Sequence, residues 1–140
     1  MSRRLPFDGE YRVTQGWGER PNVYAAVGLP GHNGIDFGLP DQTPVLAPDD
    51  AEAIEVEFDE YGYGYYVKLR TAAGEDWLLA HLHPWHLPRT GEWLASGVMV
   101  GYSGSTGWST GAHLHCGYRP VGVDHSGPWR GWAPPPLPLP

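Results

Sequence analysis

The stretch AEAIEVEFDEYGYGYYVKLR, residues 51–70, carries the pattern that decides the fold. In its first half, Ala53, Ile54, Val56 and Phe58 alternate with acidic residues, mostly with a period of two. Successive side chains of a strand point to opposite faces, so this pattern predicts a strand with one face in water. The segment EYGYGYYVKLR, residues 60–70, predicts the turn and the return strand of a hairpin.

Strand-like runs separated by turn clusters also occur along the rest of the chain. They are YRVTQGW (11–17), GIDFGL (34–39), PVLAP (44–48), EDWLLAHLH (75–83), VMVGYSG (98–104) and HLHCGYR (113–119). Glycine (20) and proline (15) make up a quarter of the 140 residues, which opposes helices because each interior Gly costs about 1 kcal/mol and each Pro about 3. The sequence therefore predicts an all-β fold, a compact antiparallel β sandwich or rolled sheet.

The length and aromatic content predict one folded domain. A chain of 140 residues is of ordinary single-domain size, and its seven Trp, eight Tyr and three Phe argue against disorder. No repeat or internal linker is visible. We expect a single domain over residues 1–133 and a Pro-rich tail over residues 134–140, lying extended on the surface or free.

Charge and cysteine content exclude several classes of partner. The net charge is −7 and Lys68 is the only lysine, so no basic patch is available for nucleic acid. No apolar run approaches the roughly 20 residues that span a bilayer, and no signal peptide is visible, so we expect no membrane partner and leave the localisation open. With Cys116 as the only cysteine, any metal must be held by histidines and carboxylates.

The segment GLPGHNGIDFGLP carries the first candidate ligands, His32 and Asp36. In a flat strand these residues would lie about 13 Å apart, too far to share one ion. A bend near Gly34 would bring them together. The alternative is a turn with a surface histidine and a capping aspartate.

Two His-x-His pairs provide further candidates. In STGAHLHCGYR, His113 and His115 share one face of a strand, so one could bind an ion while the other acts on whatever fills the open position. His81 and His83 form a similar pair, and spacing alone does not decide which pair ligates a metal. Both pairs could instead be ordinary strand histidines. We expect His83 at the rim, and we assign no role to two loop histidines, His86 and His125.

The loop GYSGSTGWSTGAHLH, residues 101–115, leads into the second pair. Its glycines let the backbone approach a ligand closely, and it lacks the lysine of a phosphate-binding loop. It fits the floor for an extended peptide substrate, with Gly107, Ser109 and Thr110 as contacts. The alternative is an ordinary turn-rich connection.

Together these segments resemble the lysostaphin/LytM-type zinc metallopeptidases, which cut peptidoglycan peptides. The order and spacing of the family's motifs agree from about residue 11 to residue 120. The matching segments are HNGIDFGLP (32–40), TPVLAP (43–48), YGYGYYVKL (61–69), AHL (80–82) and GEWLASGVMVGYSGSTGWSTGAHLH (91–115).

The resemblance implies a fold, a metal and a reaction. The fold is the family's antiparallel β domain, the duplicated hybrid motif. One Zn²⁺ per chain is held by His32, Asp36 and His115, and the catalytic histidines are His81 and His113. The expected reaction is zinc-dependent hydrolysis of a peptidoglycan peptide, cross-bridge or stem, by a monomeric metalloendopeptidase.

The resemblance also suggests roles for individual residues. His113 is the first choice as general base, and His81 would stabilise the oxyanion or protonate the leaving amine, although these roles could be exchanged. Tyr24 is a further candidate donor to the tetrahedral intermediate. Cys116, where relatives carry an aromatic residue, is expected in the core.

Three rival interpretations keep a related fold. The chain could be a catalytically inactive zinc-binding or scaffold domain that acts as an activator. It could be a phosphoryl carrier of the sugar phosphotransferase type, which would not need Asp36. It could also be a structural module of a virion.

Overall fold

Strands dominate the structure, a computed structural model that describes residues 3–139. Each predicted strand-like run contains a strand, so the all-β prediction is confirmed, and only the two-residue strand β7 was missed. The strands are β1 (Val13–Gln15), β2 (Ile35–Phe37), β3 (Pro44–Leu46), β4 (Ala51–Asp59), β5 (Gly64–Thr71), β6 (Asp76–Leu82), β7 (Trp93–Leu94), β8 (Met99–Tyr102) and β9 (Leu114–Arg119).

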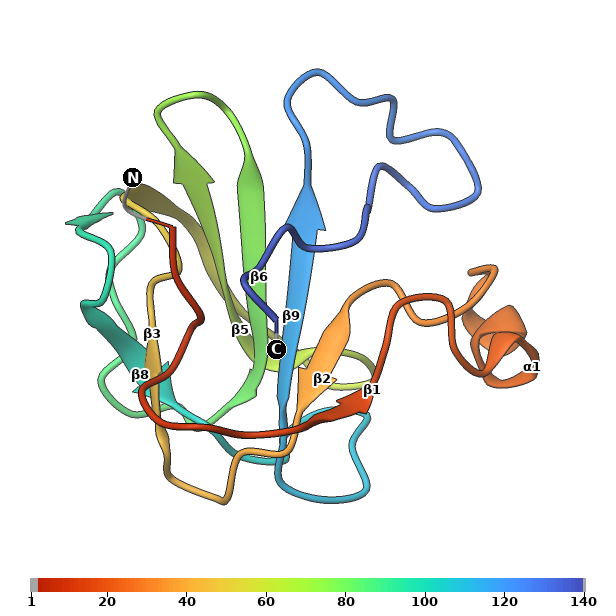
Figure 1. The fold of residues 1–140 in the computed structure, drawn as a ribbon, viewed down its shortest axis with the longest axis horizontal. Coiled ribbons are helices and arrows are strands. Elements are labelled where there is room, and N and C mark those ends of the chain that lie inside the picture. The colour runs from red at the N-terminus through yellow and green to blue at the C-terminus, as the bar shows by residue number, and fades with distance from the viewer. Residues whose placement is uncertain (1–2, 140) are drawn as a thin grey trace.

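Helical structure within residues 3–139 is limited to one short segment. It comprises α1 (Pro21–Tyr24) and a single 3₁₀ turn, η1 (Ala25–Val27). No helix in this part of the chain is long and apolar enough to cross a membrane. Figure 1 shows α1 at the edge of the molecule, beyond the end of β1.

The stretch 51–70 forms the predicted hairpin. β4 pairs with β5 in antiparallel register from Ala51 opposite Thr71 to Asp59 opposite Gly64. The register shifts between Ala53 and Glu55, so Ile54 is an extra residue in β4. This bulge explains why the period of two is imperfect, because inward positions before and after a bulge are out of phase.

Two antiparallel sheets enclose one core. The larger sheet has the order β1-β2-β9-β6-β5-β4-β7, and β3 pairs with β8 in a second sheet (Figure 1). Val45 of β3 and Val100 of β8 belong to the same buried cluster as Val67 and Trp77 of the larger sheet. Cys116 is fully buried in this cluster, which confirms its expected core position.

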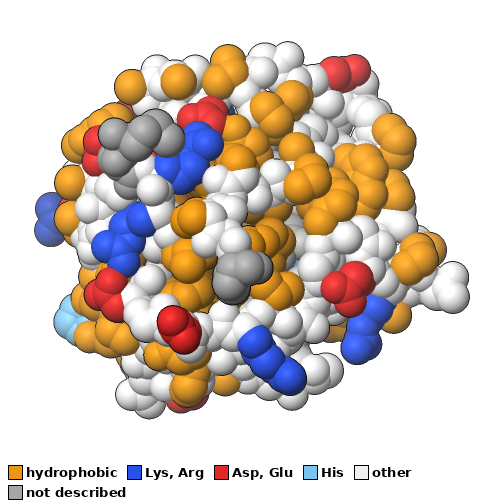
Figure 2. All heavy atoms as spheres, in the orientation of Figure 1, with side chains coloured by type: hydrophobic (Ala, Val, Ile, Leu, Met, Phe, Trp, Pro, Cys, Tyr) orange, Lys and Arg blue, Asp and Glu red, His pale blue; other side chains and the backbone are white. Residues whose placement is uncertain are grey.

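The C-terminal segment packs on the domain. Ala133 donates its N–H to the carbonyl of Tyr118 at 2.9 Å, Pro135 is buried and Leu137 contacts the core. Of the expected tail, Pro135 and Leu137 therefore pack on the protein, its other described residues are exposed, and residue 140 is outside the described residues. Figure 2 shows hydrophobic side chains exposed around the middle of this face, where the C-terminal segment ends in Figure 1.

The loop after β8 is locked to the β4–β5 turn. Trp108 donates its N–H to the carbonyl of Gly62 at 2.7 Å, and Tyr65 donates its N–H to Oγ1 of Thr106 at 3.1 Å. Gly107 has a φ of +76°, and a Cβ on it would lie 2.5 Å from the carbonyl oxygen of Gly62. This close backbone contact fixes the loop that leads to His113.

We expect Gly107→Ala to destabilise the protein by about 2 kcal/mol or more, because it combines a positive φ with steric overlap. Gly111→Ala is the matched control: Gly111 lies in the same loop, with no positive φ and open space around its Cβ position. Its cost should stay within about 0.5 kcal/mol. Urea denaturation of both metal-free variants checks this, and equal stabilities would contradict the packing described.

Candidate metal centre

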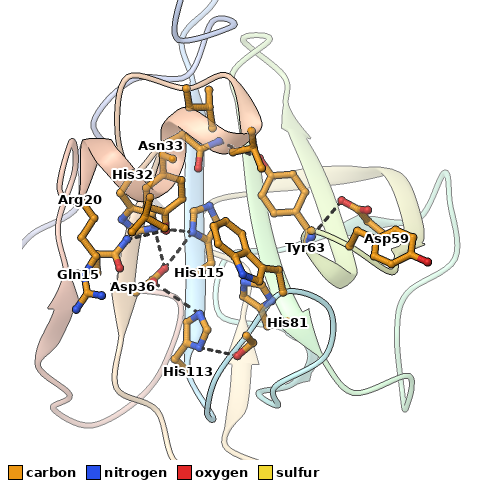
Figure 3. Close-up of a pocket in the computed structure, with 18 of the residues that line it drawn as sticks. Gln15, Arg20, His32, Asn33, Asp36, Asp59, Tyr63, His81, His113 and His115 are labelled. Carbon is orange, nitrogen blue, oxygen red and sulfur yellow. Dashed lines mark hydrogen bonds and ion pairs between the residues drawn. The ribbon is translucent and has the colours of Figure 1, made fainter.

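Adjacent strands place two of the expected ligands opposite each other. Asp36 of β2 is the register partner of His115 of β9, and Nδ1 of His115 lies 3.0 Å from Oδ1 of Asp36. His32 completes the group from the segment before β2, with Nε2 at 3.1 Å from both Oδ1 of Asp36 and Nδ1 of His115. Figure 3 shows the three side chains converging.

A bend at Gly34 brings His32 back towards Asp36, as predicted. A Cβ on Gly34 would lie 2.5 Å from the carbonyl oxygen of Cys116 and 2.7 Å from Cε1 of His115. Only glycine lets this segment approach β9 so closely. The N–H of His32 donates to the carbonyl of Glu19 at 2.9 Å, which fixes the segment from its other side.

The donor set fits zinc. Nδ1 of His32 lies 3.0 Å from the carbonyl of Gly16 and can donate a hydrogen there, which leaves Nε2 available to bind a metal. Nε2 of His32, Oδ1 of Asp36 and Nδ1 of His115 lie 3.0–3.1 Å from one another, a spacing that suits three ligands of one cation. Ligands of a tetrahedral zinc lie about 3.3 Å apart, and two imidazoles with one carboxylate leave a fourth position open.

The three residues are buried, and the surroundings of Asp36 and His115 suit the binding of a cation. His32 is 1% exposed, Asp36 8% and His115 4%. Burial acts to raise the pKa of Asp36, but hydrogen bonds with His115 and His32 hold that pKa well below its usual range. Burial also lowers the pKa of His115, which favours the neutral imidazole that binds metal.

A bulge directs His81 into the same site. The pairing of β5 with β6 shifts between Tyr65 and Val67, so Ala80 and His81 together face one residue of β5. His81 has a φ of 65° and donates Nδ1–H to the carbonyl of Thr106 at 2.7 Å. Burial, reinforced by His115, lowers the pKa of His81 to about 4, so its ring is neutral.

His113 lies just before β9, one residue outside the strand that we expected to hold it. An isolated bridge to Gly104 fixes its backbone. Its Nδ1 lies 2.9 Å from the carbonyl of Gly111 and 3.2 Å from Oγ of Ser109. Nε2 lies 3.6 Å from Oδ2 of Asp36, while the rings of His113 and His81 are 4.6 Å apart.

All five of these residues line one cavity of about 420 Å³. Of the expected substrate contacts, Tyr24, Ser109 and Thr110 also line it, whereas Gly107 is not among the lining residues and packs against the β4–β5 turn. The hydroxyl of Tyr24 accepts a hydrogen bond from Nε2 of Gln15 at 2.6 Å.

The cavity contains aromatic and amide residues that the sequence analysis missed. Nδ2 of Asn33 donates to the hydroxyl of Tyr63 at 2.9 Å, and the Tyr63 ring lies 5.6 Å from that of His115. Trp108 lies 5.6 Å from the ring of Tyr24. The sequence offered one clue for each residue: Asn33 follows His32, Tyr63 lies in the YGYGYY turn and Trp108 lies in the glycine-rich loop.

The remaining histidines lie outside the cavity. His83 is at the rim side of β6, as expected, where Nε2 contacts Oδ1 of Asp41 at 2.7 Å and the ring stacks on Trp85 at 4.2 Å. His86 and His125 are exposed. The structure thus brings together both histidines of the His113/His115 pair, but only His81 of the other pair, with His32 and Asp36.

Sequence comparison agrees with this geometry. Lysostaphin from Staphylococcus simulans is 33% identical over 109 residues, a match that covers 75% of this chain and 21% of lysostaphin. The chain spans only about a quarter of the length of the curated relatives it matches, between 19% and 28%.

Solved structures share the fold. A variant of the catalytic domain of the prophage-encoded M23 protein EnpA from Enterococcus faecalis has a TM-score of 0.73 and 26% identity, covering 96% of this chain and 95% of that one. A zinc-containing peptidase from Vibrio cholerae has a TM-score of 0.72 and 29% identity, covering 83% of this chain and 36% of that one.

The profile of peptidase family M23 matches residues 30–126, a span that holds all five residues described above. With this match over more than half of its length, a lysostaphin-like fold and a buried group of two histidines and one aspartate, the chain belongs to peptidase family M23.

Proposed function

We propose that the chain is a zinc-dependent endopeptidase that hydrolyses peptide bonds of bacterial peptidoglycan. One observation carries this proposal: Nε2 of His32, Oδ1 of Asp36 and Nδ1 of His115 converge at 3.0–3.1 Å in a cavity that two further imidazoles line. Membership of a family that includes lysostaphin supports the substrate class.

His32, Asp36 and His115 would hold the zinc ion. When bound there, zinc would act as a Lewis acid that lowers the pKa of water to about 7 and polarises the scissile carbonyl. The open side of the three ligands faces the cavity, so a peptide can reach it.

The contacts of His113 support a role as the general base. Its Nδ1–H is anchored to the carbonyl of Gly111, so the proton of the attacking water goes to Nε2. The resulting imidazolium lies 3.6 Å from Oδ2 of Asp36, whose negative charge stabilises it. Ser109, also bonded to Nδ1, helps to orient the ring.

His81 fits proton transfer to the leaving amine better than donation to an oxyanion. Its Nδ1–H is committed to Thr106, so the neutral ring offers only an acceptor at Nε2. It can accept the second hydrogen of the attacking water, and burial makes the imidazolium a strong enough acid to pass that proton to the amine.

Tyr24 supplies the missing oxyanion donor. Because its oxygen accepts a hydrogen bond from Gln15, its own hydrogen is available to the cavity. The ring lies 5.3 Å from that of His32, which supports a role for the hydroxyl near the reacting carbonyl.

The purified protein should contain close to one zinc per chain, and Asp36→Ala should remove it, because the variant loses the only anionic ligand. Asp41→Ala is the control, since Asp41 contacts His83 outside the cavity. Metal analysis by mass spectrometry measures both. Unchanged zinc in Asp36→Ala would refute the ligand assignment, and hydrolysis by metal-free protein would refute metal dependence.

His113→Ala should keep its zinc but lower kcat on peptidoglycan by roughly 10²–10⁴, the usual contribution of a general base. The matched control is His83→Ala, which removes an imidazole outside the cavity and should keep normal turnover. Near-normal kcat in His113→Ala would transfer the base role to His81. A wild-type protein that binds zinc but hydrolyses nothing would support the inactive scaffold instead.

Tyr24→Phe should lower kcat by about 10²–10³ with little change in KM, as for loss of one oxyanion donor. Tyr102→Phe removes the same hydroxyl from a half-buried tyrosine that does not line the cavity, and it should behave as wild type. Steady-state hydrolysis of muropeptides gives both constants. A Tyr24→Phe enzyme with unchanged kcat would exclude the hydroxyl from the reaction.

A further inference from the structure

Three arginines beside the metal centre have no acidic partner. Within residues 3–139 the cations that form ion pairs with carboxylates are Arg3, Arg4, Lys68 and Arg70. The other five arginines of this part of the chain form none. Of these, Arg20 and Arg130 line the cavity of the metal centre and Arg119 lines a neighbouring cavity of about 270 Å³, whereas Arg12 and Arg89 line neither. The position of these three arginines makes them available to an anionic group of a bound substrate.

The two cavities adjoin each other. They share Asp59, Tyr63 and Arg130, so a substrate that extends from the metal centre past Tyr63 reaches the second cavity. The acids there are already engaged. Oε2 of Glu55 accepts from the Tyr66 hydroxyl and lies 3.5 Å from Nζ of Lys68, and Oδ2 of Asp59 accepts the N–H of Tyr63 at 3.1 Å.

Arg130 is held in place at the junction. Its Nη2 donates to the carbonyl of Val27 at 2.7 Å, which ties the C-terminal loop to the segment after Tyr24. Trp129 stacks on Trp17 at 4.3 Å beside it. Arg130 also adopts a φ of 55°, a conformation that costs free energy and recurs at ligand-binding positions.

Arg119 fixes Arg130 from the other side. Nε of Arg119 donates to the carbonyl oxygen of Arg130 at 3.0 Å, and its guanidinium stacks 4.0 Å above the Trp132 ring. A guanidinium has five N–H donors, so both arginines keep donors for a ligand. Both arginines line the second cavity, and the planar fork of a guanidinium matches the geometry of a carboxylate.

Arg20 lies elsewhere in the first cavity. Figure 3 shows Arg20 and Asp59 at opposite ends of the group of side chains, with the metal-binding residues between them. Arg20 does not line the second cavity, whereas Arg130 lines both. The junction is therefore the position where a bound peptide would meet two arginines.

We propose that Arg130, supported by Arg119, binds a carboxylate of the substrate and selects a carboxylate-bearing stem peptide over a neutral glycine bridge. This inference rests on the proposed peptidoglycan peptidase function and names the substrate class of the same site. The carboxylate is either the C-terminal one of a peptide chain or that of an acidic side chain.

Four substrates test the proposal with the zinc-loaded 140-residue chain. They are a cross-linked muropeptide with free carboxylates, the same compound amidated at its C-terminus, the same compound amidated at its side chains, and pentaglycine. Wild type should show a kcat/KM at least about tenfold higher for the free acid than for one of the two amides, mainly through KM. The amide that loses activity identifies which carboxylate is bound.

Arg130→Gln should raise KM for the free acid by about tenfold and leave its kcat unchanged, because the contact is made equally in the ground and transition states. The kcat/KM for the less active amide should not change. Arg130→Lys should restore part of the preference, since it keeps the charge but not the fork. Arg89→Gln, which removes an exposed arginine that lines neither cavity, should behave as wild type. Thermal denaturation verifies that all variants are folded.

Several results would overturn the proposal. The first is an equal kcat/KM of wild type for the free acid and both amides, and the second is cleavage of pentaglycine at the rate of the free acid. The third is a loss of the preference for the free acid over the amide in Arg20→Gln but not in Arg130→Gln. Calorimetric binding of the free acid and the amides to zinc-loaded His113→Ala gives a readout without turnover. A carboxylate preference in binding, with no hydrolysis by wild type, would refute the peptidase function but keep this inference.

Discussion

The pairing of β2 with β9 is the constraint on which the site depends. It places Asp36 opposite His115, and the pairing of β9 with β6 places His115 opposite Ala80, next to His81. Two metal ligands and a catalytic candidate therefore lie along one row across three strands. A slip of one residue in either pairing would turn the side chains to the other face of the sheet. The buried cluster of Ile35, Leu79 and Cys116 opposes such a slip.

Strands and loops contribute different parts of the chemistry. The sheet supplies Asp36 and His115, whose positions must be accurate because ligand distances tolerate little error. Loop carbonyls, those of Gly16, Thr106 and Gly111, each accept the Nδ1–H of one histidine and so choose its tautomer. The backbone contact of Gly107 with the β4–β5 turn fixes two of these carbonyls indirectly. The loops therefore influence proton positions and supply His32, while the sheet positions the other two ligands.

Local patterns predicted much of this arrangement. The alternation in residues 51–59 and the glycine-rich turns were enough for an all-β fold, and the bend between His32 and Asp36 followed from Gly34. Spacing alone did not choose between the two His-x-His pairs, because that choice depends on which strands are neighbours. The resemblance to a family made the choice, and the structure brings His115 to Asp36 and leaves His83 with Asp41.

Other features could not be predicted from the sequence, for physical reasons. The bulge at His81 reverses the strand alternation, and a pattern of period two contains no sign of it. Tyr63 and Arg130 reach the site through contacts between segments far apart in the chain. Gly107, expected under the substrate, instead packs against Gly62 and Gly64, since its backbone fits where a side chain would not. Long-range packing, rather than local propensity, decides these positions.

Anomalous diffraction from crystals of the zinc-loaded protein would show whether the three converging atoms bind zinc. Data collected on both sides of the zinc absorption edge should show one strong anomalous peak per chain. The peak should lie about 2.0–2.2 Å from Nε2 of His32, Oδ1 of Asp36 and Nδ1 of His115. The absence of a peak among these atoms, or a peak at His83 and Asp41 instead, would show that they do not hold the zinc.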